Sequence, residues 1–410
     1  MANRIPKSLI LFHRHGHRAP AKNIIANNSA DAKYCVGEHA LWQGHCDIAH
    51  IVTRLDDKHP VTVGSLNGLE AFTPHDLKTY PFGNLTSTGV SYLEQQARDL
   101  CSTFPVLTEY PLENTIIHST NFKRTQISAQ VVWNEILRNR GDWHPDSVGP
   151  VPINVRHPTQ CSLSFFDRAS DVAGAAIKEV QGLPRFQEVT QETTGTTAEL
   201  VRHFPRLGEH RSGFDWMGAL DYYSCRRGHG LLPAPAVAHL EPAVYRHLVQ
   251  RFSLYLSHPK YLSNFMGPLV HDLCALIEGL EESKGFEFHV FSGHDINLLG
   301  LLFLLRAPAV APDPTSISSY QDFSTMWPDF GTTMVMEVHS PEEINLYMNC
   351  QPLQVDIQGV ISGGVGGTHS GDSDRKSATV TLQELKALYD ALREHLVSMG
   401  TDNEPHSGMF

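Results

Sequence analysis

Three apolar, strand-like runs of this chain each end in a short polar motif. Residues 8–13 lead into Arg-His-Gly-His-Arg, residues 115–118 into Ser-Thr-Asn-Phe-Lys-Arg, and residues 286–291 into Ser-Gly-His-Asp. Strand, loop and helix in this recurring order are typical of α/β proteins with a mostly parallel sheet. Because open α/β sheets bind ligands at the carboxyl ends of their strands, we expect the three motifs to meet at one edge of the sheet.

The rest of the pattern completes an α/β core. Apolar residues at spacings of three and four predict helices from about residue 88 to 101 and over 124–138, 269–281 and 382–397. Strands are predicted at 332–338 and 344–348, as a hairpin across the turn at Pro341. Residues 35–69 show no clear periodicity and are predicted to form a loop.

The character of the sequence changes between residues 152 and 268. Helical patches surround a turn-rich middle there, and no parallel-strand run is recognisable. We therefore predict a discontinuous α/β core from residues 1–151 and 269–397, with a mostly α-helical insertion over 152–268 that forms the substrate wall. The Gly/Ser-rich residues 359–376 and the tail at 398–410 are predicted to be mobile.

Composition limits the partners and the compartment. A formal net charge of -12 at pH 7 argues against a nucleic-acid partner, which requires a basic surface. The longest apolar run is too short for a transmembrane segment, and no signal-like segment precedes the first strand. The sequence as written predicts a soluble cytoplasmic protein, or a secreted or lysosomal one if a leader has been removed. It leaves the oligomeric state open.

The motifs carry side chains that suit phosphoryl transfer. Arg14 and Arg18 flank His15 on one loop, and Arg124 begins a predicted helix. Arginine binds phosphate through paired hydrogen bonds and stays charged, so three arginines can surround the equatorial oxygens of a phosphoryl group. Gly16 allows backbone and phosphate to approach closely. A small phosphorylated substrate is the partner that this set predicts.

The remaining roles fall to two histidines and one aspartate. A neutral His15 can attack phosphorus without losing a proton first, which gives a phosphohistidine. Asp295 is the natural donor of a proton to the leaving oxygen, and it would then act as the base for the attacking water. His294 and the start of the following helix add positive character around the phosphate.

The sequence Arg-His-Gly-His-Arg-Ala-Pro at 14–20 matches the RHGxRxP signature of the histidine acid phosphatase family, branch 2 of the histidine phosphatase superfamily. The resemblance extends over most of the chain. Asn-Leu-Thr at 84–86 with Gly89 resembles the family's xLTxxG segment, His-Ser-Thr-Asn-Phe-Lys-Arg-Thr at 118–125 is similar to RSTDxDRT, and Gly-His-Asp-Ile-Asn at 293–297 resembles its HD motif.

The resemblance implies a Rossmann-like core with a helical insertion, and a metal-independent acid phosphatase that needs no cofactor. It implies that His15 is the nucleophile and Asp295 the proton donor. The phosphate ligands that it implies are Arg14, Arg18, Arg124 and His294.

Several positions depart from the family pattern. Asn121 and Lys123 stand where many members carry aspartates, and His118 replaces an arginine. Members are frequently secreted with disulfides, and in that case a pair between Cys161 and Cys350 is the first expectation here. No two of the seven cysteines lie at the Cys-x-x-Cys spacing of a zinc site.

Two residues are candidate substrate contacts. His17 occupies the variable position of the RHGxRxP motif. Asn297 follows Asp295 by two residues and resembles the HDxN sequence of phytase-like relatives, which slightly favours an inositol phosphate. A lysophosphatidate or another small monoester fits the sequence equally well.

Two other classes of function compete with a phosphatase. The first is a catalytically weak phosphoinositide- or phosphoprotein-binding module on the same fold, which the presence of both His15 and Asp295 disfavours. The second is a metal-binding protein, because His13, His15 and His17 alternate. The neighbouring arginines would repel a cation, so the sequence predicts no metal site there.

Overall fold

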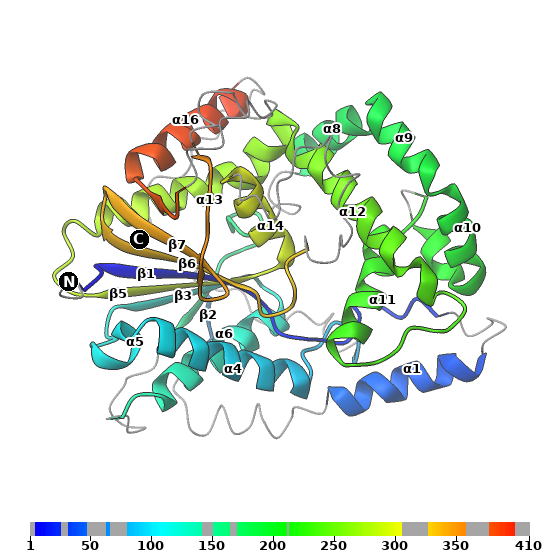
Figure 1. The fold of residues 1–410 in the computed structure, drawn as a ribbon, viewed down its shortest axis with the longest axis horizontal. Helices are drawn as coiled ribbons and strands as arrows, with labels where there is room; N and C mark the ends of the chain where they lie inside the picture. Colours follow the sequence, from blue (N-terminus) through cyan, green and yellow to red (C-terminus); the bar gives the residue numbers. More distant parts are fainter. Residues whose placement is uncertain are drawn as a thin grey trace.

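A computed structural model of the chain describes residues 5–25, 32–46, 63–65, 80–141, 151–164, 170–210, 213–305, 327–357 and 377–397. In these ranges nine strands form one sheet, in the order β2-β4-β3-β5-β1-β6-β7-β8, with β9 paired to β7 (Figure 1). The strands are β1 (Ser8–Arg14), β2 (Val63–Ser65), β3 (Thr115–Ser119), β4 (Ile153–Val155), β5 (Glu287–Gly293), β6 (Thr333–Ser340), β7 (Glu343–Met348), β8 (Gln351–Pro352) and β9 (Thr379–Val380).

The register of the parallel strands brings the three motifs together. Strands β2, β4, β3, β5 and β1 run parallel, whereas β6, β7, β8 and β9 add antiparallel pairs. Arg14 at the end of β1 lies opposite Gly293 of β5, and Ser119 at the end of β3 lies opposite Ser292. The predicted α/β class with a mostly parallel sheet is confirmed, and so is the hairpin of β6 and β7.

Alternation along β1 divides the core into two layers. Leu9 and Leu11 pack on one face of the sheet with α4 (Ser87–Thr103) and α6 (Lys123–Arg138). Ile10 and Phe12 point to the other face, where α13 (Pro259–Gly279), α14 (Asp295–Leu304) and α16 (Leu382–Val397) lie. Side chains at alternating positions of a strand point to opposite faces, so a seven-residue strand with every residue buried supports both layers.

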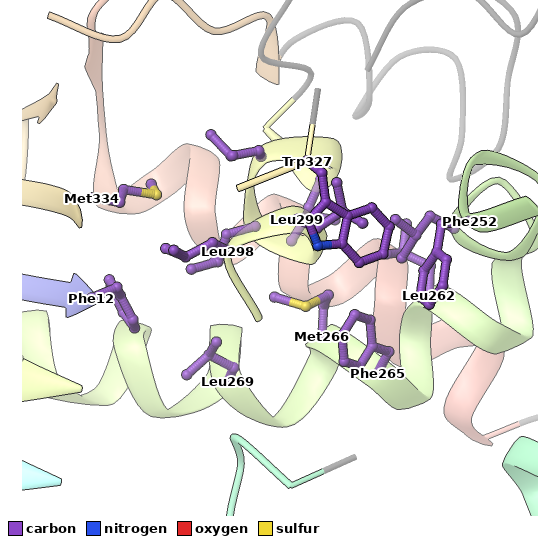
Figure 2. Packing of buried hydrophobic residues seen from close by; sticks show 14 of the residues in the cluster. Phe12, Phe252, Leu262, Phe265, Met266, Leu269, Leu298, Leu299, Trp327 and Met334 are labelled. Carbon is purple, nitrogen blue, oxygen red and sulfur yellow. The ribbon is translucent and has the colours of Figure 1, made fainter. Parts of the chain in front are cut away.

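A group of helices follows β4 in the chain and lies beside the sheet (Figure 1). Figure 2 shows that one apolar cluster joins Phe12 and Met334 of the sheet to Phe252 and Trp327. None of the helices described here combines the length and the apolar character that a membrane span requires. The group comprises α8 (Ser170–Gln181), α9 (Pro184–Glu192), α10 (Thr194–His203), η1 (Pro205–Glu209), α11 (Trp216–Gly228), η2 (Ala238–Leu240) and α12 (Glu241–Leu256).

Two predictions about secondary structure are wrong. Residues 152–268 do contain a parallel strand, because β4 pairs with β2 and β3, and only its three-residue length hides it in the sequence. The expected loop at 35–69 includes most of α1 (Ala32–His45), whose Trp42 is fully buried and donates its indole N–H to Glu38. The predicted domain boundary at 268 falls inside α13. Residues 359–376 and 398–410 lie outside the described ranges.

The expected disulfide between Cys161 and Cys350 is also wrong, because the two side chains pack in different apolar clusters and the thiol of Cys350 is free. Cys161 belongs to the apolar cluster that contains Phe12, whereas Cys350 packs against the cluster that contains Leu11. The two cysteines therefore pack on opposite faces of the sheet.

Candidate active site

The loop after β1 is held against the sheet and against α4 by its backbone. His15 donates its backbone N–H to Gly293 of β5 over 3.1 Å, and the N–H of Gly16 reaches the hydroxyl of Ser128 on α6 over 3.1 Å. A Cβ on Gly16 would lie 2.7 Å from the backbone oxygen of Gly89 on α4. Only glycine fits this close approach, so the motif glycine sets the path of the loop.

The imidazole of His15 is buried and presents one nitrogen for reaction. Its Nδ1 lies 2.9 Å from the carbonyl oxygen of Gly16. Because a carbonyl can only accept, Nδ1 carries the proton and the lone pair is on Nε2. Burial lowers the pKa of His15 well below its usual value, and the charges of Arg124, Arg18 and Arg14 lower it further. His15 is therefore neutral at mildly acidic pH.

Arg14 is fixed on three sides. Its Nη2 lies 2.9 Å from Oδ2 of Asp295, its Nη1 donates to the carbonyl of Pro328 over 2.7 Å, and its guanidinium stacks 3.9 Å from the ring centre of Phe330. Phe330 also packs against the ring of His15, with 5.6 Å between the ring centres. One aromatic ring thus supports both the nucleophile and its neighbouring arginine.

Arg18 pairs with a carboxylate from the helical region. Its Nη2 lies 2.7 Å from Oδ1 of Asp221 on α11, and its Nη1 donates to Oδ2 over 2.9 Å. Burial alone would lower the pKa of Arg18, but the charge of Asp221 outweighs burial and raises it. Arg18 therefore stays charged in this buried position.

Arg124 enters from the first turn of α6. Its guanidinium lies 4.2 Å from the ring centre of Phe122, and the same ring meets His294 edge to face, with 5.1 Å between ring centres. Arg124 is the charge that most lowers the pKa of both His15 and His294, after burial. The three motif arginines therefore act on one place, next to both histidines.

Asp295 begins α14 and has three donors. Oδ2 accepts from Arg14 and from the indole N–H of Trp327 at 2.8 Å, and Oδ1 accepts the backbone N–H of Ile296. Burial would raise the pKa of Asp295, but the charge of Arg14, the Trp327 hydrogen bond and His294 outweigh burial and lower it. Without substrate, the carboxyl group is therefore held in its charged form.

The sequence profile of the histidine phosphatase superfamily (branch 2) matches residues 7–349. The chain belongs to that family. The prediction of a phosphoric monoester hydrolase of the histidine acid phosphatase type is thereby confirmed. No curated protein matches the chain by sequence.

Solved structures share the fold at low sequence identity. The phytase of Hafnia alvei in complex with tartrate aligns with a TM-score of 0.52 at 12% identity, over 95% of this chain and 97% of that chain. The phytase of Klebsiella sp. ASR1 gives 0.51 at 14% identity, over 95% and 97%. The multiple inositol polyphosphate phosphatase of Bifidobacterium longum, in complex with inositol hexasulfate, gives 0.50 at 14% identity, over 93% and 91%.

The two residues of this histidine phosphatase that were predicted to contact substrate lie in different surroundings. Asn297 is buried, accepts the backbone N–H of His294 and donates to the carbonyl of Leu163, which favours a positioning role over contact with substrate. His17 lies among the rings of Tyr92, Phe330 and His229. Burial lowers its pKa to about 4, so His17 is neutral near pH 6.

Three residues of the site could not be identified from the sequence. Asp221, Trp327 and Phe330 each touch a motif residue, but none of them lies in a recognisable motif. Trp327 and Phe330 come shortly before β6, and Asp221 lies in the middle of α11. Within the described ranges no three metal-ligating side chains gather as a cation site.

Proposed function

We propose that the chain hydrolyses phosphate monoesters through a phosphohistidine at Nε2 of His15. The observation that carries this proposal is the hydrogen bond from Nδ1 of His15 to the Gly16 carbonyl, which leaves Nε2 with its lone pair. Arg14, Arg18 and Arg124 would hold the phosphate oxygens, together with His294. The family membership of the chain supports this reaction class.

In the first half of the reaction, the lone pair of Nε2 forms the N–P bond while the P–O bond to the leaving group breaks. The leaving oxygen takes a proton from Asp295. Asp295 must be protonated for this step, although Arg14 and Trp327 hold it charged in the free enzyme. A bound phosphate adds negative charge beside Asp295 and shares Arg14 with it, and both effects raise the pKa of the carboxyl group.

In the second half, Asp295 acts as a base. A water molecule gives a proton to the carboxylate, its oxygen forms a bond to phosphorus, and the N–P bond breaks. The electron pair of that bond returns to Nε2 of His15, and inorganic phosphate is released. The groups that hold the phosphoryl oxygens serve both halves, because the charge on those oxygens develops at the same place each time.

For the substrate, we propose an inositol phosphate as the first class to test. The neighbours of similar fold include phytases and an inositol polyphosphate phosphatase that binds inositol hexasulfate. A lysophosphatidate or another small monoester is the alternative.

The proposal is tested by trapping the intermediate. Protein is mixed with a ³²P-labelled monoester, quenched in alkali because a phosphoramidate is labile in acid, and separated from free label. The label should appear on wild-type protein and be absent from His15→Ala. Hydrolysis of p-nitrophenyl phosphate from pH 4 to 8 with EDTA present should be lost in the same variant, by about four orders of magnitude or more.

His239→Ala is the matched control, because this histidine lies on the surface of the helical region, where its ring pairs with Glu199. It should label and turn over as the wild type does. Folded wild-type protein that neither turns over any monoester nor takes up label would contradict the proposal and favour the binding module.

A further inference from the structure

A carboxylate already binds the guanidinium of Arg18, one of the proposed phosphate ligands. Asp221 binds both terminal nitrogens of Arg18, at 2.7 and 2.9 Å, and also accepts the backbone N–H of Ala21. Its side chain is mostly buried, and the thiol of Cys225, one turn along α11, lies 3.6 Å from its Oδ1. These contacts hold the carboxylate on the arginine, so it does not move freely in solvent.

Arg18 also has an Nε edge, which Asp221 does not occupy. The Nε atoms of Arg14 and Arg18 are buried and have no hydrogen-bond partner among the described residues. A buried, charged N–H without a partner is costly, so these two groups favour an anionic acceptor. Because Asp221 holds the Nη fork, Arg18 would receive a phosphate oxygen through its Nε side.

The carboxylates also limit the positive charge of the site. Asp295 pairs with Arg14 and Asp221 pairs with Arg18, so each of these two motif arginines has a carboxylate in contact. Three cations of the surrounding segments also have a carboxylate partner. Lys22 contacts Asp215, Arg226 contacts Glu38, and Arg227 contacts Asp329. A second phosphate beside the reacting one would therefore meet carboxylates as well as cations.

From this arrangement, and resting on the proposed function, we propose that Asp221 is a specificity-determining residue. Its negative charge disfavours substrates that carry further phosphates next to the reacting one. The preferred substrate class is accordingly a monoester with a single phosphate, such as an inositol monophosphate, rather than a hexakisphosphate.

The test is Asp221→Asn, which removes the charge and keeps the size and one acceptor for Arg18. We measure kcat and KM for an inositol monophosphate and for inositol hexakisphosphate, and the inhibition constant of inorganic phosphate. The variant should bind phosphate about tenfold more tightly and shift the ratio of kcat/KM toward the hexakisphosphate by about tenfold, because a like charge near the bound anion is removed.

Two further variants separate charge from structure. Asp221→Glu retains the charge and should keep the wild-type ratio. Glu188→Gln removes an exposed carboxylate that pairs with Arg185 on α9, and it should leave the ratio unchanged. An unchanged ratio in Asp221→Asn, or an equal loss of kcat on both substrates, would overturn the inference.

The wild type alone supplies a second test that does not depend on the folding of a variant. It should hydrolyse the monophosphate with a kcat/KM about tenfold or more above that for the hexakisphosphate. Preference for the hexakisphosphate would overturn the role of Asp221 and leave the phosphatase proposal intact. Absence of activity on both inositol phosphates and on p-nitrophenyl phosphate would contradict the proposed function itself.

Discussion

The two sides of the site are built differently. On the sheet side, Arg14, His15, His294 and Asp295 follow directly from the ends of β1 and β5, and the register between those strands fixes their backbone. On the helical side, Asp221 reaches Arg18 through side-chain contacts. A strand register fixes several residues at once, whereas a helical contact depends on how distant segments pack.

The residues proposed for catalysis and the residue proposed for substrate specificity lie on different sides of the site. The groups proposed for bond making and breaking lie on the rigid sheet side, where backbone hydrogen bonds hold them. Asp221, proposed to select the substrate, comes from the other side. Substitutions on the helical side can therefore change the preferred substrate without moving the nucleophile.

The largest effect is expected on the sheet side, for Asp295→Asn. An amide cannot donate the proton that a poor leaving group requires, so kcat for an alkyl phosphate should fall by about 10²- to 10⁴-fold. The loss for p-nitrophenyl phosphate should be smaller, because p-nitrophenolate leaves with little protonation. Steady-state kinetics on both substrates measures the difference, and equal losses would argue against an acid role for Asp295.

Substitutions at two glycines allow the two sides to be compared directly. Gly89 lies on α4, which packs on the sheet, Gly228 lies on α11 of the helical side, and both pack against His17. A Cβ on Gly89 of α4 would lie 2.1 Å from the backbone oxygen of His17, and one on Gly228 of α11 would lie 2.2 Å from its Nδ1. The backbone cannot yield, whereas a side chain can turn aside. Gly89→Ala should therefore lower the free energy of unfolding by about 3 kcal/mol, and Gly228→Ala by about 1 kcal/mol.

Urea titration measures both changes. The control is Gly174→Ala in α8, where an added Cβ meets nothing within 4 Å. It should stabilise the protein by about 0.5 kcal/mol, because alanine restricts the unfolded chain and favours a helix. If Gly228→Ala were as damaging as Gly89→Ala, the helical side would be as rigid as the sheet side, and the comparison would fail.

Fold elements whose own residues carry a pattern could be predicted from the sequence, whereas elements placed by their neighbours could not. Long periodic elements such as α6 and α16, and strands with continuous apolar runs such as β1, were recognisable because their own residues carry the pattern. The three-residue strand β4 was missed because it owes its place to neighbours on both sides. Helix α1 was missed because its apolar residues follow no helical stripe and its Trp42 is buried by packing.

The site divides in the same way. His15 and Asp295 could be proposed from the sequence because each lies in a short motif at the end of a strand. Asp221 and Trp327 could not, because each reaches the site only through tertiary packing. Asn297 was expected at the substrate, but both of its hydrogen bonds lead to backbone groups, a fact that no linear pattern contains.

The smallest effect is expected for Trp327→Phe, because Trp327 donates its indole N–H to Asp295. A hydrogen bond to a carboxylate favours the charged form, so Trp327→Phe should raise the pKa of Asp295. Because Asp295 must be protonated when the leaving group departs, the alkaline limb of kcat/KM should move to higher pH, by about half a unit to one unit. Trp133→Phe is the control, since that buried indole N–H has no hydrogen-bond partner among the described residues, and its limb should not move. A limb that stayed in place in Trp327→Phe, or moved to lower pH, would show that Trp327 supports the fold and does not set the acidity of Asp295.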